Sequence, residues 1–322
     1  MPMISVVIPA HGPEPWLARC VDALFVQRFP TWRREIIIVD NGMAESARAI
    51  VDRQSSLRVI EEPGRGAYAA RNAGIRAARG DIIAFTDADC SVAPDWLESV
   101  DHAMRDPGTE LIVGSYLPAR STFAASALAS YENEKNRYIF EGDDDDLYYG
   151  YTNNMAVRTR VFDRIGGFRP RIRGSDAILV RQTVERFGRD GVRFVPGMAV
   201  RHLEVRGALD YFRKVFVHSR SVRALGRVVT HRPLDPDERM DVFREVIRRN
   251  AYSSIAAARL LSLLAIGLVA WKAGRIVPWQ EPSGTRHDGR PLQPVGVTGS
   301  VQRNGSTDRT AEPEGGDWKQ AI

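Results

Sequence analysis

The sequence predicts an α/β protein with a mostly parallel sheet, helices on both faces of that sheet, and further helices toward the C-terminus. Short apolar runs rich in β-branched residues alternate with amphipathic stretches over residues 1–116. Strands that are apolar along their whole length are typical of a parallel sheet covered on both faces. The 322 residues are 43% hydrophobic and 26% charged, a globular composition that excludes a fibrous or wholly disordered chain.

Five strands and four helices account for the regular part of this pattern. The expected strands cover residues 4–9, 35–39, 57–60, 82–86 and 111–115. One helix follows Pro15, because proline is favoured in a first helical turn. The other expected helices cover residues 67–78, 176–187 and 209–225.

Cysteine usage and the two ends of the chain carry further expectations. Cys20 and Cys90 cannot form a disulfide framework and have no metal-ligand spacing, so a reducing compartment is expected. No basic region precedes the first apolar run, so no signal peptide is expected. Residues 276–322 are rich in Gly, Pro, Ser and Thr without an apolar period, and we expect a disordered tail there.

The net charge of +5 is concentrated in one late segment. Residues 201–249 hold 12 Lys and Arg against 7 Asp and Glu, so their surplus of 5 equals that of the whole chain. Anionic lipid, a phosphorylated substrate or nucleic acid would each explain this segment, and so would a solvated basic helical face.

An apolar run follows the basic segment. Residues 255–271 contain a single charged side chain, Arg259, and are flanked by basic residues on both sides. A full membrane span needs about 20 apolar residues. The run is therefore expected to be a membrane-associated helix at the interface, with a true span and a soluble core helix as the alternatives.

Two carboxylates stand at the end of the fourth expected strand. Asp87 and Asp89 follow residues 82–86, and open α/β sheets bind ligands at the carboxyl ends of their strands. Two carboxylates there suit Mg²⁺ or Mn²⁺ bridging to a diphosphate. The alternative is that a strand-end aspartate caps the next turn.

Neighbouring segments agree with a nucleotide site. Asp40 closes the second strand and can accept hydrogen bonds from a base or ribose, while Arg65 and Arg71 can meet phosphate charge. The first strand is followed by AHGPEPW rather than GxGxxG, which disfavours a nicotinamide cofactor. No GxxxxGK[ST] loop is present either, which argues against a P-loop nucleotide hydrolase.

Five segments now occur in one order over residues 4–205: ISVVIPAHG, IIIVDNG, GRGAYAARNAGIRAARGDIIAFTDADC, TNNMAVRTRVFDRIGGF and GSDAILV. In this order the chain resembles a family 2 glycosyltransferase. The resemblance implies a GT-A fold, a nucleotide-sugar donor, a divalent metal and inversion at the anomeric carbon. It implies a nucleotide-sugar-binding half at 1–116 and an acceptor-binding, catalytic half at 117–250, before the apolar helix at 251–275.

The resemblance also assigns roles to single residues. Asp40 matches a nucleoside contact, Arg71 a basic residue near the donor, and Asp87 with Asp89 the metal and nucleotide DxD motif. Asp176 matches the general base, although Ser175 stands where the family has glutamate.

Four more residues complete the expected site. Pro9, Arg65 and Asn154 are expected to contact substrate, with Asn154 on the acceptor side. His202 is expected to reach the metal or diphosphate, and its alternative is a structural histidine.

The expected function is an inverting, non-processive sugar transfer to a glycan or polyprenyl-linked hydroxyl. The Q-x-x-R-W segment of processive synthases is missing. We expect the enzyme to act in the cytoplasm at the inner face of the cell membrane, without a nucleic-acid partner. The alternatives are a nucleotide-sugar pyrophosphorylase and a catalytically inactive binding scaffold of the same fold.

Overall fold

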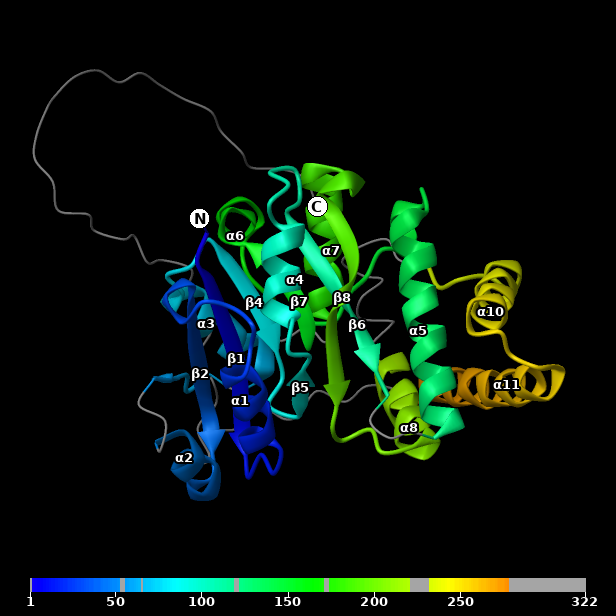
Figure 1. Cartoon of the computed structure of the whole chain (residues 1–322), viewed down its shortest axis with the longest axis horizontal. Helices are drawn as coiled ribbons and strands as arrows, with labels where there is room; N and C mark the ends of the chain where they lie inside the picture. Colours follow the sequence, from blue (N-terminus) through cyan, green and yellow to red (C-terminus); the bar gives the residue numbers. More distant parts are fainter. Residues whose placement is uncertain are drawn as a thin grey trace, which may run out of the picture. The chain divides into compact units, whose positions relative to one another are not determined.

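A single mixed sheet carries the fold. In the computed structural model, which describes residues 2–52, 56–64, 66–118, 122–170, 174–220 and 232–277, eight strands pair in the order β3-β2-β1-β4-β7-β6-β8-β5 (Figure 1). The strands are β1 (Ile4–Gly12), β2 (Arg34–Met43), β3 (Arg58–Glu61), β4 (Ile82–Thr86), β5 (Cys90–Val92), β6 (Leu111–Leu117), β7 (Asn154–Arg158) and β8 (Val192–His202). The sequence boundary at residue 116 falls inside β6, so the two expected halves share this sheet.

The sheet is mixed, and parallel pairs outnumber antiparallel ones. β3, β2, β1 and β4 are parallel neighbours, and β6 pairs with β8 in parallel. β7 runs antiparallel to β4 and β6, and β5 runs antiparallel to β8. Among these seven pairs four are parallel, which agrees with the mixed, mostly parallel sheet of an α/β protein.

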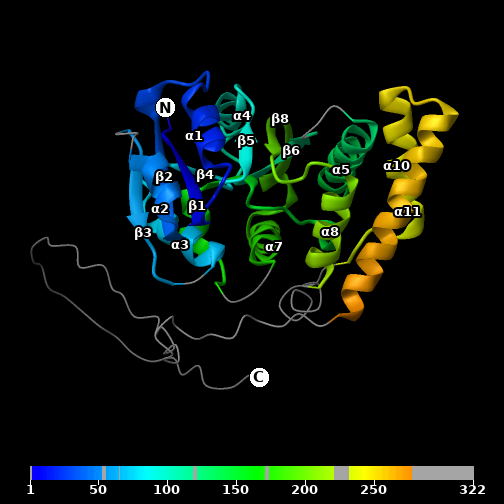
Figure 2. The same cartoon turned by 90° about the horizontal axis from the view of Figure 1, so that it is seen from below.

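Helices cover both faces of the sheet (Figure 2). They are α1 (Leu17–Phe25), α2 (Glu45–Asp52), α3 (Ala67–Ala77), α4 (Trp96–Ala103), α5 (Phe123–Glu141), α6 (Thr159–Ile165), α7 (Ser175–Phe187), α8 (Ala208–Ser219), α10 (Pro236–Asn250) and α11 (Ser254–Ile276). Alternate side chains of β1 enter two separate apolar clusters. Val7 belongs to the cluster that includes residues of α3, α5, α6 and α7, and Val6 to the cluster that includes residues of α1, α2 and α4. Burying both faces explains why the strands are apolar throughout.

Helix α3 lies unusually close to the sheet. A Cβ atom added to Gly74 would fall 2.3 Å from Cγ1 of Val7, so only glycine fits at this position. The close packing of α3 on β1 fixes the position of two α3 side chains, Tyr68 and Arg71, near the carboxyl ends of the strands.

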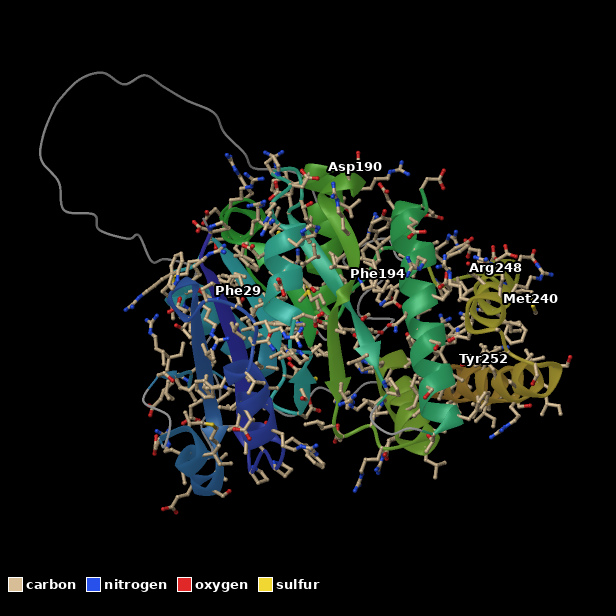
Figure 3. The ribbon with its side chains drawn as sticks, viewed as in Figure 1. Phe29, Asp190, Phe194, Met240, Arg248 and Tyr252 are labelled. Atoms are coloured by element: carbon tan, nitrogen blue, oxygen red, sulfur yellow. The ribbon has the colours of Figure 1, made fainter. Side chains whose placement is uncertain are left out.

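The C-terminal helices form a group beside α5. Tyr252, labelled in Figure 3, lies in the turn between α10 and α11. Its ring packs 5.7 Å from that of Phe123 on α5. Helix α11 then packs along α8, where an added Cβ at Gly274 would meet the Phe216 carbonyl at 2.3 Å. The expected helix at 209–225 is observed as α8, which begins at Ala208 and ends at Ser219. Residues 221–225 of the expected helix lie outside the described residues.

Helix α11 is longer than the apolar run that predicts it. It has 23 residues, and its most apolar 18-residue window has a mean hydropathy of 1.9 and is only 11% buried. By length and composition it can cross a membrane, and its exposure does not agree with a buried core helix. The tail from residue 278 onward lies outside the described residues.

Candidate active site

The candidate site lies at the carboxyl ends of the parallel strands. Parallel pairing brings the carboxyl ends of β1, β2 and β4 to one edge of the sheet. Asp40 follows the apolar residues 36–39 of β2, and Asp87 follows the last residue of β4. Polar side chains that are far apart in the sequence thus meet at one edge of the sheet.

Asp87 is held by the buried Arg71. The guanidinium of Arg71 donates through Nη2 to Oδ1 of Asp87, and its Cζ lies 5.4 Å from the ring centroid of Tyr68. Only 4% of Arg71 is exposed, and its Nε has no hydrogen-bond partner among the described residues. A buried guanidinium with an unused donor beside a carboxylate is a potential contact for a phosphate group.

Asp89 and His202 meet because β5 pairs with β8. Cys90 lies opposite His202 in that pair, and the amide of Leu203 donates to the carbonyl of Asp89 at 2.8 Å. Nδ1 of His202 then lies 3.2 Å from Oδ2 of Asp89. Strand β8 was not expected, because Pro196 interrupts its apolar pattern; the register with β6 shifts at that point.

The electrostatics of this pair suit a divalent cation. Burial, and next the charge of Asp87, raise the pKa of Asp89 to about 7. Burial and the nearby Lys214 lower the pKa of His202 to about 4, so its imidazole is neutral at pH 7. A buried carboxylate whose negative charge is not fully neutralised by its neighbours can bind Mn²⁺ or Mg²⁺, and so can a neutral imidazole.

Cys90 is the third group near this pair. Ligand atoms of Asp89, Cys90 and His202 all lie within 4.8 Å of one another. Burial raises the pKa of Cys90 well above its usual value, so it stays a protonated thiol. Within this group the donors that fit a metal are Asp89 and His202. Asp87, which was also expected as a ligand, lies outside the group and is paired with Arg71.

Asp176 occupies the N-terminus of α7. Only 7% of it is exposed, and its Oδ1 accepts hydrogen bonds from the Tyr68 hydroxyl at 2.9 Å and from the amide of Ala177 at 3.0 Å. Burial raises the pKa of Asp176, while Arg71 and the Tyr68 hydroxyl act in the opposite direction. The group is a buried carboxylate whose affinity for a proton exceeds that of an exposed aspartate.

Asn72, to which the sequence analysis assigns no role, fixes the segment Gly166-Gly167-Phe168. Nδ2 of Asn72 donates to the carbonyl of Phe168 at 2.7 Å, and Oδ1 accepts from its amide at 2.9 Å. A Cβ at Gly167 would lie 2.5 Å from Oδ1 of Asn72. The Phe168 ring stacks on Tyr68 at 5.6 Å, so the segment supports the residue that contacts Asp176.

The Asp40 carboxylate is already hydrogen-bonded within the last residues of β2. Its Oδ1 accepts from the amides of Gly42 and Met43 at 2.9 and 2.7 Å, and its Oδ2 is paired with Arg48. The neighbouring Asn41 donates to the carbonyls of Glu62 and Gly64 and so ties the next loop to this turn.

The remaining expected site residues differ in their placement. Arg65 lies outside the described residues, and Pro9 is half-buried on β1 opposite Val39. Asn154 was expected to contact the acceptor, but its side chain is 0% exposed. Its amide donates to the carbonyls of Ser115 and Met198 and accepts from Nε1 of Trp96, so it serves as a hydrogen-bonding group of the core.

Comparison with known proteins shows the family of the chain. The family described as Glycosyl transferase family 2 matches residues 5–175, more than half of the chain. Glycosyltransferase AglE of Haloferax volcanii is 30% identical over 173 residues, which cover 52% of this chain and 56% of that protein. Glycosyltransferase GlyG of Streptococcus pneumoniae is 29% identical over 119 residues, covering 35% of this chain and 39% of that protein. The chain thus matches about half or less of the length of these relatives.

Solved structures share the fold. Mannosyltransferase PcManGT from Pyrobaculum calidifontis, in complex with GDP-Man and Mn²⁺, superposes with a TM-score of 0.58 at 17% identity. The superposition covers 85% of this chain and 86% of that one. The eight-stranded sheet therefore has the GT-A fold, and the chain belongs to glycosyl transferase family 2.

Proposed function

We propose that this chain transfers one sugar, with inversion, from a nucleotide-sugar donor to a hydroxyl of a glycan or lipid-linked acceptor. The observation that carries the proposal is the arrangement of two carboxylate centres at one edge of the sheet. Asp87 and Asp89 lie on one side, Asp176 on the other, and Tyr68 with Arg71 connects them through hydrogen bonds and ring contact.

Asp89 and His202 are the groups that would hold Mg²⁺ or Mn²⁺. When bound, the metal would supply a positive charge that stabilises the diphosphate leaving group as a Lewis acid. PcManGT, which shares the fold, was solved with Mn²⁺ and a nucleotide-sugar, and this supports the assignment. Asp87 contributes by holding Arg71 at the phosphate side of the site.

Asp176 would act as the general base. It would accept the proton of the acceptor hydroxyl while that oxygen forms a bond to the anomeric carbon and the nucleoside diphosphate leaves with the bonding electrons. Burial raises the pKa of Asp176, which makes the carboxylate a stronger base than an exposed aspartate. One displacement by an incoming group opposite the leaving group inverts the configuration.

Helix α11 supports an acceptor at a membrane surface. Its exposed apolar side chains are Ile255, Leu261, Ile266, Leu268, Val269 and Ile276. The opposite side of the helix, with Leu260 and Gly274, packs on the rest of the protein. Because α11 is attached along its length, we propose that it lies in the plane of the interface on the cytoplasmic face of the cell membrane.

A donor screen tests the proposed chemistry. The chain is incubated with UDP-, GDP-, ADP- and dTDP-sugars in Mn²⁺ or Mg²⁺, and release of the nucleoside diphosphate is measured. We expect one nucleotide class to be hydrolysed slowly and EDTA to stop the reaction. No release from any donor under either metal would favour the inactive scaffold of the same fold.

A further inference from the structure

Helix α8 presents one face to the candidate active site. Tyr211, Lys214 and His218 recur at intervals of three and four residues and therefore share a side of the helix. The hydroxyl of Tyr211 donates to Glu132 on α5 at 2.7 Å, and the His218 ring lies 5.5 Å from that of Tyr151. These contacts hold α8 in place and thereby fix the backbone position of Lys214.

The ammonium of Lys214 lies against both proposed metal ligands. Its Nζ is 2.6 Å from Nε2 of His202, 3.9 Å from Oδ2 of Asp89 and 3.0 Å from Oε2 of Glu204. Because Nδ1 of His202 faces Asp89, the Nε2 lone pair is the one that accepts from Lys214. Lys214 thus uses the same lone pair that a metal ion would need.

A surface ion pair does not account for this placement. Glu204 is 62% exposed, and an exposed pair of this kind contributes little to stability. The ammonium, by contrast, has a side chain only 30% exposed and is directed inward at an imidazole and a carboxylate. An ammonium placed beside two proposed metal ligands is therefore a candidate for a role in ligand binding at that site.

We propose that Lys214 is a donor-binding residue that holds the diphosphate of the nucleotide-sugar. The proposal rests on the proposed function, since it requires a diphosphate at the Asp89 and His202 edge. The His202 lone pair cannot accept from Lys214 and hold a metal at once, so the ammonium would have to leave Nε2 if Asp89 and His202 held a metal. The flexible four-carbon side chain keeps the ammonium of Lys214 close to the site. The ammonium would then pair with the negatively charged diphosphate of the bound donor.

Two equilibrium measurements on Lys214→Met test this role. In the first, Mn²⁺ alone is titrated and free Mn²⁺ is followed by electron paramagnetic resonance. We expect the variant to bind Mn²⁺ about fivefold more tightly than wild type, because the competing charge is gone. In the second, calorimetry at saturating Mn²⁺ follows the nucleoside diphosphate that wild type binds best among UDP, GDP, ADP and dTDP. We expect about 10-fold weaker binding, the loss typical of a charged hydrogen bond.

Controls separate a donor contact from a general loss of charge or fold. Lys272→Met on α11 removes the same charge at an exposed position outside the site and should change neither affinity. Lys214→Arg should keep diphosphate binding within about threefold of wild type, because it retains the cation. The matching nucleoside monophosphate should bind wild type and Lys214→Met equally, because it lacks the second phosphate.

The outcomes distinguish this proposal from the function on which it rests. Metal-dependent diphosphate binding that is the same in wild type and Lys214→Met overturns the role of Lys214 and leaves the proposed function intact. Equal loss of monophosphate and diphosphate binding also overturns it, since the effect then does not concern the second phosphate. Wild type that binds no nucleoside diphosphate in Mn²⁺ contradicts the proposed function itself, and the role of Lys214 fails with it.

Discussion

The hydroxyl of Tyr68 donates a hydrogen bond of 2.9 Å to Oδ1 of Asp176. The two residues are far apart in the sequence and come from α3 and α7. The Tyr68 ring also contacts Arg71, which bonds Asp87. A continuous set of contacts therefore joins the proposed base to the proposed diphosphate side of the site.

Tyr68→Phe tests how this hydrogen bond tunes the base. The bond to the charged carboxylate lowers the pKa of Asp176, so its removal should raise that pKa further above the ordinary value. Transfer is lost as pH falls through the pKa of the base, so the acidic limb of the kcat profile should move to higher pH. Tyr138→Phe on α5 is the control and should leave the profile in place. An unmoved acidic limb in Tyr68→Phe would show that this bond does not act on the base.

Asp176→Asn tests the base itself. The amide keeps the size of the side chain but cannot accept the proton, so transfer should fall by about 10²-fold or more. Binding of the nucleoside diphosphate should stay near the wild-type value. Asp163→Asn on the exposed side of α6 is the matched control. If Asp176→Asn transfers within a fewfold of wild type, another group accepts the proton, and Glu185 is the next to test.

Local signals predicted the strand that leads to the site. Residues 82–86 form β4 with the expected bounds, because a continuous apolar run ends at two carboxylates. His202 was expected from resemblance, yet the strand that delivers it was missed, since Pro196 and Gly197 interrupt its pattern.

The positions of Lys214 and Asn154 depend on tertiary packing and could not be predicted from the local sequence. Lys214 reaches the site because α8 is held by α5 and by α11, and no local sequence pattern indicates these contacts. Asparagine is common in loops, so the sequence does not indicate that Asn154 is buried. The three-dimensional structure shows that its side-chain amide hydrogen-bonds two carbonyls and Trp96. Polar side chains that serve buried backbone groups resemble binding residues until their partners are known.

Asn154→Ala should therefore lower stability rather than affinity. The change leaves Nε1 of Trp96 and two buried carbonyls without their partner, which should cost about 3 kcal/mol in the free energy of unfolding. Urea denaturation measures this loss. Asn153→Ala, which removes a single acceptor for Tyr116, should cost less. A stability equal to that of wild type would contradict the core role and return Asn154 to the acceptor side.

Val269→Glu tests docking through α11. Val269 is 68% exposed on the apolar side of the helix, and a carboxylate there opposes insertion. Co-sedimentation with vesicles containing anionic lipid should weaken by about 10-fold. Val26→Glu makes the same change at a residue that is 67% exposed after α1 and should bind as wild type does. Equal binding of all three proteins, or no binding by wild type, would contradict the membrane role of α11.

Calorimetry on Asp89→Asn tests most directly whether the edge formed by Asp89 and His202 is a metal-dependent nucleotide site. Wild type should bind its preferred nucleoside diphosphate in Mn²⁺ and lose that binding in EDTA. Asp89→Asn removes the charged ligand and should weaken binding in Mn²⁺ by at least about 10-fold, whereas Asp95→Asn, exposed before α4, should match wild type. Unchanged, metal-dependent affinity in Asp89→Asn would contradict the proposed site.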